Sequence, residues 1–317
     1  NFDFDIDGWL WEVLDYFGMV SWVDSLVQGY LEDAIEDAVY DAVPDLLADA
    51  LQGLEISTEM ESGDRTFFID AVPEDAEVDG TGMTVFFEST VTVDSWESVY
   101  TGLGSLFYGY GEPAWATSMG GTVMGISLDF LNQVLYAFWG GGLLDYELSG
   151  DELGLDVEDL AVFLPSISSG SLSLVVEPLL PPVVVPGTGA AMMDLQIGDM
   201  LLTIYDGEPS TGTVFMEVYV STVVGLDFVA GGDTELVAET SDEVVYFDVI
   251  YPESGTQAAS DTEALLELLV PILLPDLAET VGSIPLPELE GLTLTGISLD
   301  MEGAEDGVLI VGGDLTE

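Results

Sequence analysis

The sequence has no lysine, no histidine and no cysteine, and its only basic residue is Arg65. Without histidine and cysteine, a Ser-His-Asp site, a Cys-His site, a zinc site of the usual ligands and any disulfide are excluded. Without lysine, the chain cannot form a phosphate-binding P-loop. Most catalytic machinery is therefore absent by composition, and we expect no enzymatic activity and no required cofactor.

Positive charge is almost missing, because 61 Asp and Glu residues stand against one arginine, for a net charge of -60. Contacts to phosphate groups need lysine or arginine, so neither nucleic acid nor an anionic membrane surface is an expected partner. Unpaired negative charges repel one another and are screened by salt. The composition is typical of adaptation to high salt or calcium, and we expect a secreted protein, extracellular or periplasmic.

Apolar residues are abundant, at 48% of the 317 residues with a mean hydropathy of +0.41. Prolines interrupt the stretch most similar to a membrane span, at Pro178, Pro181, Pro182 and Pro186, so we expect no transmembrane helix. A large core or a lined cavity could each hide this much apolar surface, and the chain is long enough for two domains.

The first half of the chain predicts a strand, a long helix and further strands. Residues 2–7 alternate apolar and acidic side chains, which indicates a half-buried strand. Apolar pairs then recur every four residues within 9–52, which predicts a long helix that wraps a twisted sheet or breaks at Pro44. A period of two follows from about 54 to 110, with a turn-rich stretch at 73–82 between two strands.

The second half predicts a strand at 124–128, a helix capped by Asp129 and stopped by three glycines at 140–142, and mostly strands from 146 to 250. A second long helix is expected to start after residues 260–262 and to continue to Val281. Two closing strands are expected at about 292–301 and 307–313.

Four segments carry a resemblance to a known family, and one of them, within residues 162–185, reads as a strand followed by a Pro-rich corner. Residues 265–294 place internal helix prolines before Gly282 and a Pro285-Leu286-Pro287 corner. Residues 125–148 read as a strand, a helix and a strand, and residues 2–52 as a strand and a long helix. In this order the chain resembles the bactericidal/permeability-increasing and lipid-transfer proteins, the tubular lipid-binding superfamily.

The resemblance implies an α+β fold, with long curved antiparallel sheets or barrels that each pack against a long helix in an elongated, boomerang-like arrangement. Residues 1–97 would form a partial first lipid-binding domain, residues 98–115 a hinge, and residues 116–317 a complete second domain. Each domain would hold an apolar pocket between its long helix and its sheet.

We therefore expect the protein to bind, and to transport, apolar uncharged lipid in an internal hydrophobic groove. Plain core packing would explain the same apolar stripes. The alternative function is a structural subunit of an extracellular fibre or surface layer, which assembles with itself or with a partner chain that completes the first domain. The candidate lipid-lining residues are Leu10, Leu14, Phe17, Val23, Val27, Phe130, Leu131, Val134, Phe138, Leu265, Leu268, Leu269 and Ile272.

A weak calcium motif lies at the start of the chain. Asp3, Asp5 and Asp7 have the spacing of the first ligands of an EF-hand loop, but the twelfth position is Leu14 where a glutamate is needed. The strand interpretation of residues 2–7 is favoured over calcium binding there, and the many other carboxylates favour adventitious calcium elsewhere over a site at these residues.

Overall fold

A computed structural model describes residues 56–62, 65–78, 83–98, 103–109, 121–150, 171–232, 235–251, 283–285, 293–302 and 307–316. Within these ranges the chain divides into two compact units, and each is described by itself. The smaller unit contains residues 56–60 and 68–90. The larger unit contains residues 61–67 and the described residues from Val91 onward.

A three-stranded sheet forms in the order β1 (Ile56–Ser62), β2 (Arg65–Val78) and β3 (Met83–Val93). The expected pairing of the two strands around residues 66–70 and 85–93 is confirmed. The expected turn-rich stretch at 73–82 is wrong in its first part, because β2 continues through Pro73 to Val78. The seven-residue β1 is half as long as β2, so the far part of β2 extends beyond its described neighbour on that side, and proline is tolerated where a strand has no neighbour to bond.

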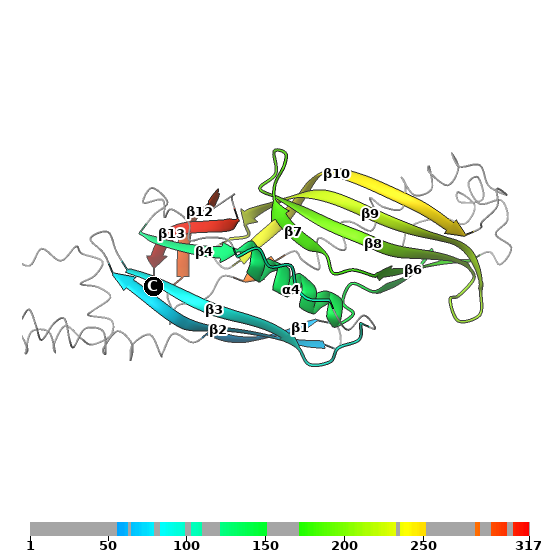
Figure 1. The fold of residues 1–317 in the computed structure, drawn as a ribbon, viewed down its shortest axis with the longest axis horizontal. Helices are drawn as coiled ribbons and strands as arrows, with labels where there is room; N and C mark the ends of the chain where they lie inside the picture. Colours follow the sequence, from blue (N-terminus) through cyan, green and yellow to red (C-terminus); the bar gives the residue numbers. More distant parts are fainter. Residues whose placement is uncertain are drawn as a thin grey trace, which may run out of the picture. The chain divides into compact units, whose positions relative to one another are not determined.

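The larger unit is built on a seven-stranded antiparallel sheet in the order β11-β10-β9-β8-β6-β5, with β7 paired to β8 (Figure 1). Its strands are β5 (Tyr146–Ser149), β6 (Leu172–Pro178), β7 (Val183–Pro186), β8 (Met193–Asp206), β9 (Thr213–Ala230), β10 (Glu235–Tyr251) and β11 (Ser283–Pro285). Alternating β-branched and polar residues account for the long strands β9 and β10.

A bulge in β8 keeps one face of this sheet apolar. Ile197 pairs with Thr222 and Met200 with Val220, so β8 carries one extra residue between these pairs. Asp199 in this bulge has a φ of 47°. Because side chains alternate along a strand, the extra residue returns Met200 to the face that Ile197 occupies.

Helix α4 (Leu128–Gly140) follows β4 (Thr122–Ser127) directly. The Ser127 hydroxyl accepts a hydrogen bond from the Phe130 N–H and caps the helix, so the prediction that Asp129 is the cap is wrong. The helix ends at Gly140 with Gly141 as its C-cap, as the glycine run predicted. The second sheet of this unit has the order β12 (Thr293–Glu302), β13 (Val308–Thr316) and β4, which confirms the two closing strands.

The expected α+β fold class, with a long helix against each sheet, is wrong. The described residues are mostly strand, the main sheet curls into a half-barrel, and α4 is the one helix among them (Figure 1). The physical reason is strand length, since β8, β9 and β10 have 14, 18 and 17 residues against 13 for α4. The strand expected at 2–7 and the long helices expected at 9–52 and after 262 lie outside the described residues.

Candidate apolar binding site

One face of the seven-stranded sheet is apolar over most of its length, and we call it the apolar face. On β9 the side chains from Met216 to Phe228 alternate, with every second one buried. The paired residues on β8 and β6 continue the pattern across the strands. The buried hydrophobic members are Leu172, Leu174, Val176, Met193, Leu195, Ile197, Met200, Leu202, Ile204, Met216, Val218, Val220, Val224, Leu226 and Phe228.

The buried polar side chain that β9 contributes to this face, Thr222, has a partner. Its hydroxyl donates a hydrogen bond of 3.2 Å to the Val244 carbonyl of the neighbouring strand. A satisfied hydroxyl needs nothing from a ligand, whereas an unsatisfied one would require a polar ligand group. The buried β9 side chains therefore form an apolar surface that has no unsatisfied hydroxyl.

Two buried side chains of helix α4 form hydrogen bonds to one region of this sheet. Asn132 bonds the backbone of Val184 on β7 through both ends of its amide. The indole N–H of Trp139 donates a 2.7 Å hydrogen bond to the Pro178 carbonyl at the end of β6. The principal packing partners of the helix among the described elements are β7 and β4, so these bonds hold α4 near one part of the apolar face.

Four of the predicted lipid-lining residues lie on α4. Leu131 and Phe138 are buried, whereas Phe130 and Val134 are half-buried on the flank of the helix. Phe138 packs edge-on against Phe67, with ring centroids 5.0 Å apart. The remaining candidates lie outside the described residues: Leu10, Leu14, Phe17, Val23, Val27, Leu265, Leu268, Leu269 and Ile272.

The residue spacing in the sequence did not predict that side chains of the strands would form this apolar face. The sequence prediction placed the lipid-lining residues on helices, because their apolar stripes were the most visible pattern. The signal for the sheet is the period-two alternation within residues 214–224 and 171–176, which predicts strands but does not show what their faces contact.

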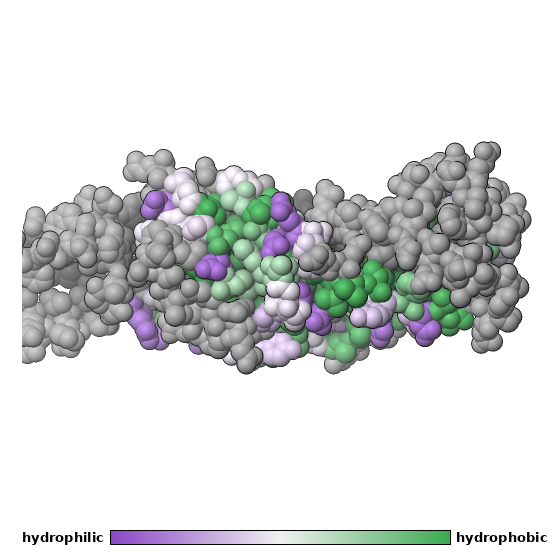
Figure 2. Space-filling view, turned by 90° about the horizontal axis from the view of Figure 1, so that it is seen from above, coloured by the Kyte–Doolittle hydropathy of each residue, from purple (hydrophilic) through white to green (hydrophobic). Residues whose placement is uncertain are grey.

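Apolar side chains are also exposed on the outer strand β10. Val244, Tyr246 and Ile250 alternate along it and have exposed side chains, with the exposed Asp248 between the last two. Figure 2 shows hydrophobic residues beside hydrophilic ones on the visible face of the molecule.

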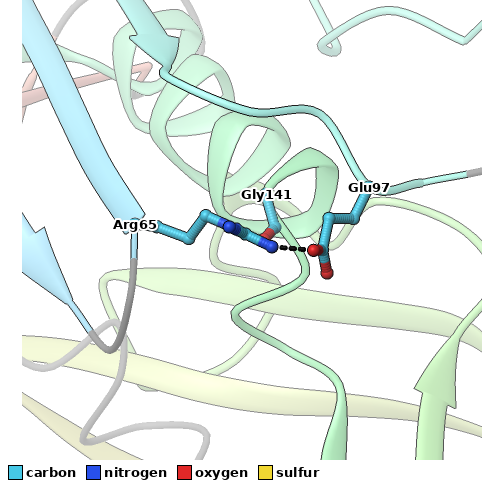
Figure 3. Close-up of polar contacts among 3 residues, drawn as sticks. All are labelled: Arg65, Glu97 and Gly141. Carbon is cyan, nitrogen blue, oxygen red and sulfur yellow. Dashed lines mark hydrogen bonds and ion pairs between the residues drawn. The ribbon is translucent and has the colours of Figure 1, made fainter.

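Arg65 has a structural environment within the larger unit. Its guanidinium forms an ion pair with Glu97 and donates a 3.1 Å hydrogen bond from Nε to the Gly141 carbonyl at the end of α4 (Figure 3). A cation beside the last carbonyls of a helix is favourable, because those groups carry partial negative charge. Arg65 therefore links β2 to the C-terminus of α4.

Asp145 is the titratable group with the clearest perturbation. Partial burial of its carboxyl group, together with the negative charge of Glu177, raises the pKa of Asp145 from 3.8 to about 6. The two residues lie one step beyond the Tyr146–Val176 pair of β5 and β6. Like charges opposite each other on neighbouring strands repel.

Within the described ranges, no group of three or more acidic residues is placed to hold a metal ion. No helix in that part of the chain combines the length and the apolar character needed to cross a membrane. The calcium candidates Asp3, Asp5 and Asp7 lie outside it.

Comparison with known proteins gives distant likenesses in structure and none in sequence. No family description matches the sequence, and no curated protein matches it. A crystal structure described as that of a lipopolysaccharide binding protein is similar with a TM-score of 0.42 and 15% sequence identity, over 93% of this chain and 66% of that one. The chain thus spans about two thirds of the length of that structure.

Proposed function

We propose that the protein binds apolar, uncharged lipid along the apolar face of its seven-stranded sheet, and that it carries out no enzymatic step. The observation that carries this proposal is the length of the apolar face compared with that of α4, the one helix among the described residues. The 18 residues of β9 extend to about 60 Å. The 13 residues of α4 extend to about 20 Å.

Because α4 is fastened at β7 and at the end of β6, it covers a limited part of that length. The remaining side chains of this face, such as Leu202, Val218 and Val220, are fully buried within the chain itself, so a lipid would contact them by displacing the protein atoms that cover them. A hydrocarbon chain gives about 0.8 kcal/mol for each buried CH₂ group, so a lipid with long chains would stabilise the fold considerably.

Lipid extracted from the purified protein is the direct test. Organic extraction followed by mass spectrometry is expected to recover an apolar lipid, and native mass spectrometry of the intact protein is expected to show the same mass added. A protein that carries no lipid after mild purification, and takes up none from an added neutral-lipid emulsion, would contradict the proposal.

A variant pair locates the lipid on the sheet. Val220→Trp adds bulk on the apolar face, whereas Tyr219→Trp adds it one residue away on the opposite face. If lipid occupies the face, Val220→Trp lowers the bound lipid per protein and Tyr219→Trp retains it. If the face is solid core, Val220→Trp lowers the melting temperature without any change in lipid content.

We further propose that the protein transports the lipid that it binds. A carrier releases its lipid to an acceptor, so labelled neutral lipid loaded on the protein is expected to move to acceptor vesicles faster than it does without protein. Retention of the label over hours would favour permanent storage of the lipid in the fold.

The exposed strand β10 favours a second candidate function, that of a structural subunit. Among the described strands, β10 pairs with β9 along its length and with β11 only at Glu235–Val237. A strand edge can accept a strand from another chain. Light scattering across a concentration series tests this, since an assembling subunit gains mass as its concentration rises.

A further inference from the structure

Residues 103–109, which we call the aromatic segment, expose apolar side chains in an otherwise acidic protein. The segment reads Leu-Gly-Ser-Leu-Phe-Tyr-Gly and contains no charged residue. Phe107 is 72% exposed and Tyr108 is 60% exposed, and Leu103 is exposed as well. Three large apolar side chains within seven residues form a patch, whereas isolated ones are ordinary on protein surfaces.

The backbone of the aromatic segment is fixed to α4 at both ends. The N–H groups of Tyr108 and Gly109 each donate a 2.8 Å hydrogen bond to one oxygen of the Asp129 carboxylate. At the other end, the Tyr136 hydroxyl donates a 2.6 Å hydrogen bond to the Leu103 carbonyl. Asp129 and Tyr136 lie two helical turns apart, so the segment runs along the helix.

These hydrogen bonds hold the backbone of the aromatic segment and leave its side chains exposed. Asp129 is only 6% exposed, so its two hydrogen bonds to the segment are sheltered from water. Bonds to a charged acceptor are stronger than neutral ones. The helix therefore holds the segment while the rings of Phe107 and Tyr108 stay in solvent, which lowers the ordering cost of placing them in a partner.

We propose that the aromatic segment is a docking site for the surface of an uncharged or zwitterionic lipid membrane. Aromatic side chains favour the boundary between headgroups and acyl chains, where the ring is buried and a hydroxyl such as that of Tyr108 stays hydrated. This site lies outside the apolar face and has a different partner, a lipid surface instead of a single lipid molecule.

The net charge of the protein determines which membrane surfaces the aromatic segment can bind. A net charge of -60 repels an anionic membrane, and the chain offers one arginine to counter it, which is paired with Glu97. The aromatic segment has no charge of its own. A zwitterionic surface therefore fits the patch, and a growing share of anionic lipid should weaken docking.

Vesicle flotation with the full chain tests this proposal. Wild-type protein is mixed with phosphatidylcholine vesicles, or with vesicles in which phosphatidylglycerol replaces 30% of the lipid, at low salt. We expect flotation with the first and less with the second. The double variant Phe107→Ser with Tyr108→Ser is expected to partition about tenfold more weakly to phosphatidylcholine.

The matched control is Tyr246→Ser on β10, because Tyr246 is 64% exposed and lies on a different element. It should float as the wild type does, and Phe107→Trp should also retain docking. Circular dichroism and melting curves show that each variant is folded. No flotation of the wild type, equal loss in both serine variants, or undiminished flotation of the double variant overturns the proposal.

Self-association is the competing result. If light scattering without lipid shows a dimer that the double variant loses, the aromatic segment binds a second copy of the chain and the membrane proposal fails. Lipid extraction from the purified protein, the test of the apolar face, gives an independent result in each case.

Discussion

Asn132 of α4 and Val184 of β7 exchange two hydrogen bonds across 52 positions of the sequence. The Asn132 amide donates to the Val184 carbonyl at 3.1 Å, and its amide oxygen accepts from the Val184 N–H at 2.7 Å. Both groups are buried. The side chain thus satisfies the backbone of β7 and positions the helix on the sheet.

Replacing Asn132 with leucine should be strongly destabilising. The change keeps the volume but leaves the N–H and C=O groups of Val184 without these partners, and an unsatisfied buried group costs about 1–3 kcal/mol. We expect the free energy of unfolding to fall by about 2–4 kcal/mol in a denaturant titration. Gln133→Leu, at the adjacent half-buried position, is the control and should change it by less than about 1 kcal/mol. Equal effects of the two variants would mean that this pair is not important for stability.

Alanine variants of Phe138 and Phe130 should distinguish side chains that pack in the core from side chains that contact a ligand on the same helix. Phe138 is buried against Phe67, so Phe138→Ala is expected to cost about 3–5 kcal/mol in unfolding free energy. Phe130 is half-buried on the helix flank, so Phe130→Ala should cost less than half as much. Thermal or denaturant unfolding gives both values, and lipid content measured on the same samples shows which ring a lipid contacts. A larger loss for Phe130→Ala would reverse the assignment.

Local patterns in the sequence predicted many of the elements. The sequence predicts strands from 146 to 250 and at about 292–301 and 307–313, where the structure has β9, β10 and the pair β12–β13, and three glycines mark the end of α4. These features depend on neighbours a few residues apart, which a single sequence displays directly. The turn-rich stretch failed at Pro73, because the local signal for a turn does not show whether a strand lies at a sheet edge.

Long-range contacts could not be predicted in this way. Asp129 has the residue type of a helix cap, yet its carboxylate binds the backbone at residues 108–109, some 20 positions earlier in the chain. Nothing in the spacing of Asn132 indicates a partner on β7. The fold class failed for a related reason, since apolar stripes suggested long helices while the described part of the chain is dominated by very long strands.

Asp145 should make stability depend on pH in the acid range. Its pKa is about 6 in the folded protein against 3.8 as the ordinary value, so the folded state binds the proton more tightly than the unfolded state. Its favourable contribution is therefore complete below about pH 4 and is lost as the pH rises from about 4 to 6. Asp145→Asn removes this dependence, and its unfolding free energy should exceed that of the wild type at pH 7.

The gain from Asp145→Asn should be small, about 1 kcal/mol or less, because the residue as a whole is exposed although its carboxyl group is partly buried, and water therefore screens its repulsion from Glu177. Denaturant titrations at pH 4 and pH 7 measure it. Glu147→Gln, on the adjacent strand β5, removes one negative charge two residues away and is the control. If both variants gain equally at pH 7, the gain comes from net charge and not from the Asp145–Glu177 contact.

Salt should stabilise the whole chain, because 61 acidic residues and one arginine leave 60 negative charges without a cationic side chain. The screening length falls from about 10 Å at 0.1 M salt to about 3 Å at 1 M, so repulsion between exposed carboxylates weakens over this range. We expect the melting temperature to rise by on the order of 5 °C or more between these concentrations. Sodium chloride and potassium chloride should act alike if screening is the cause, whereas sulfate would also strengthen apolar burial and is unsuitable. A melting temperature that stays constant in both chlorides would show that the acidic surface does not limit stability.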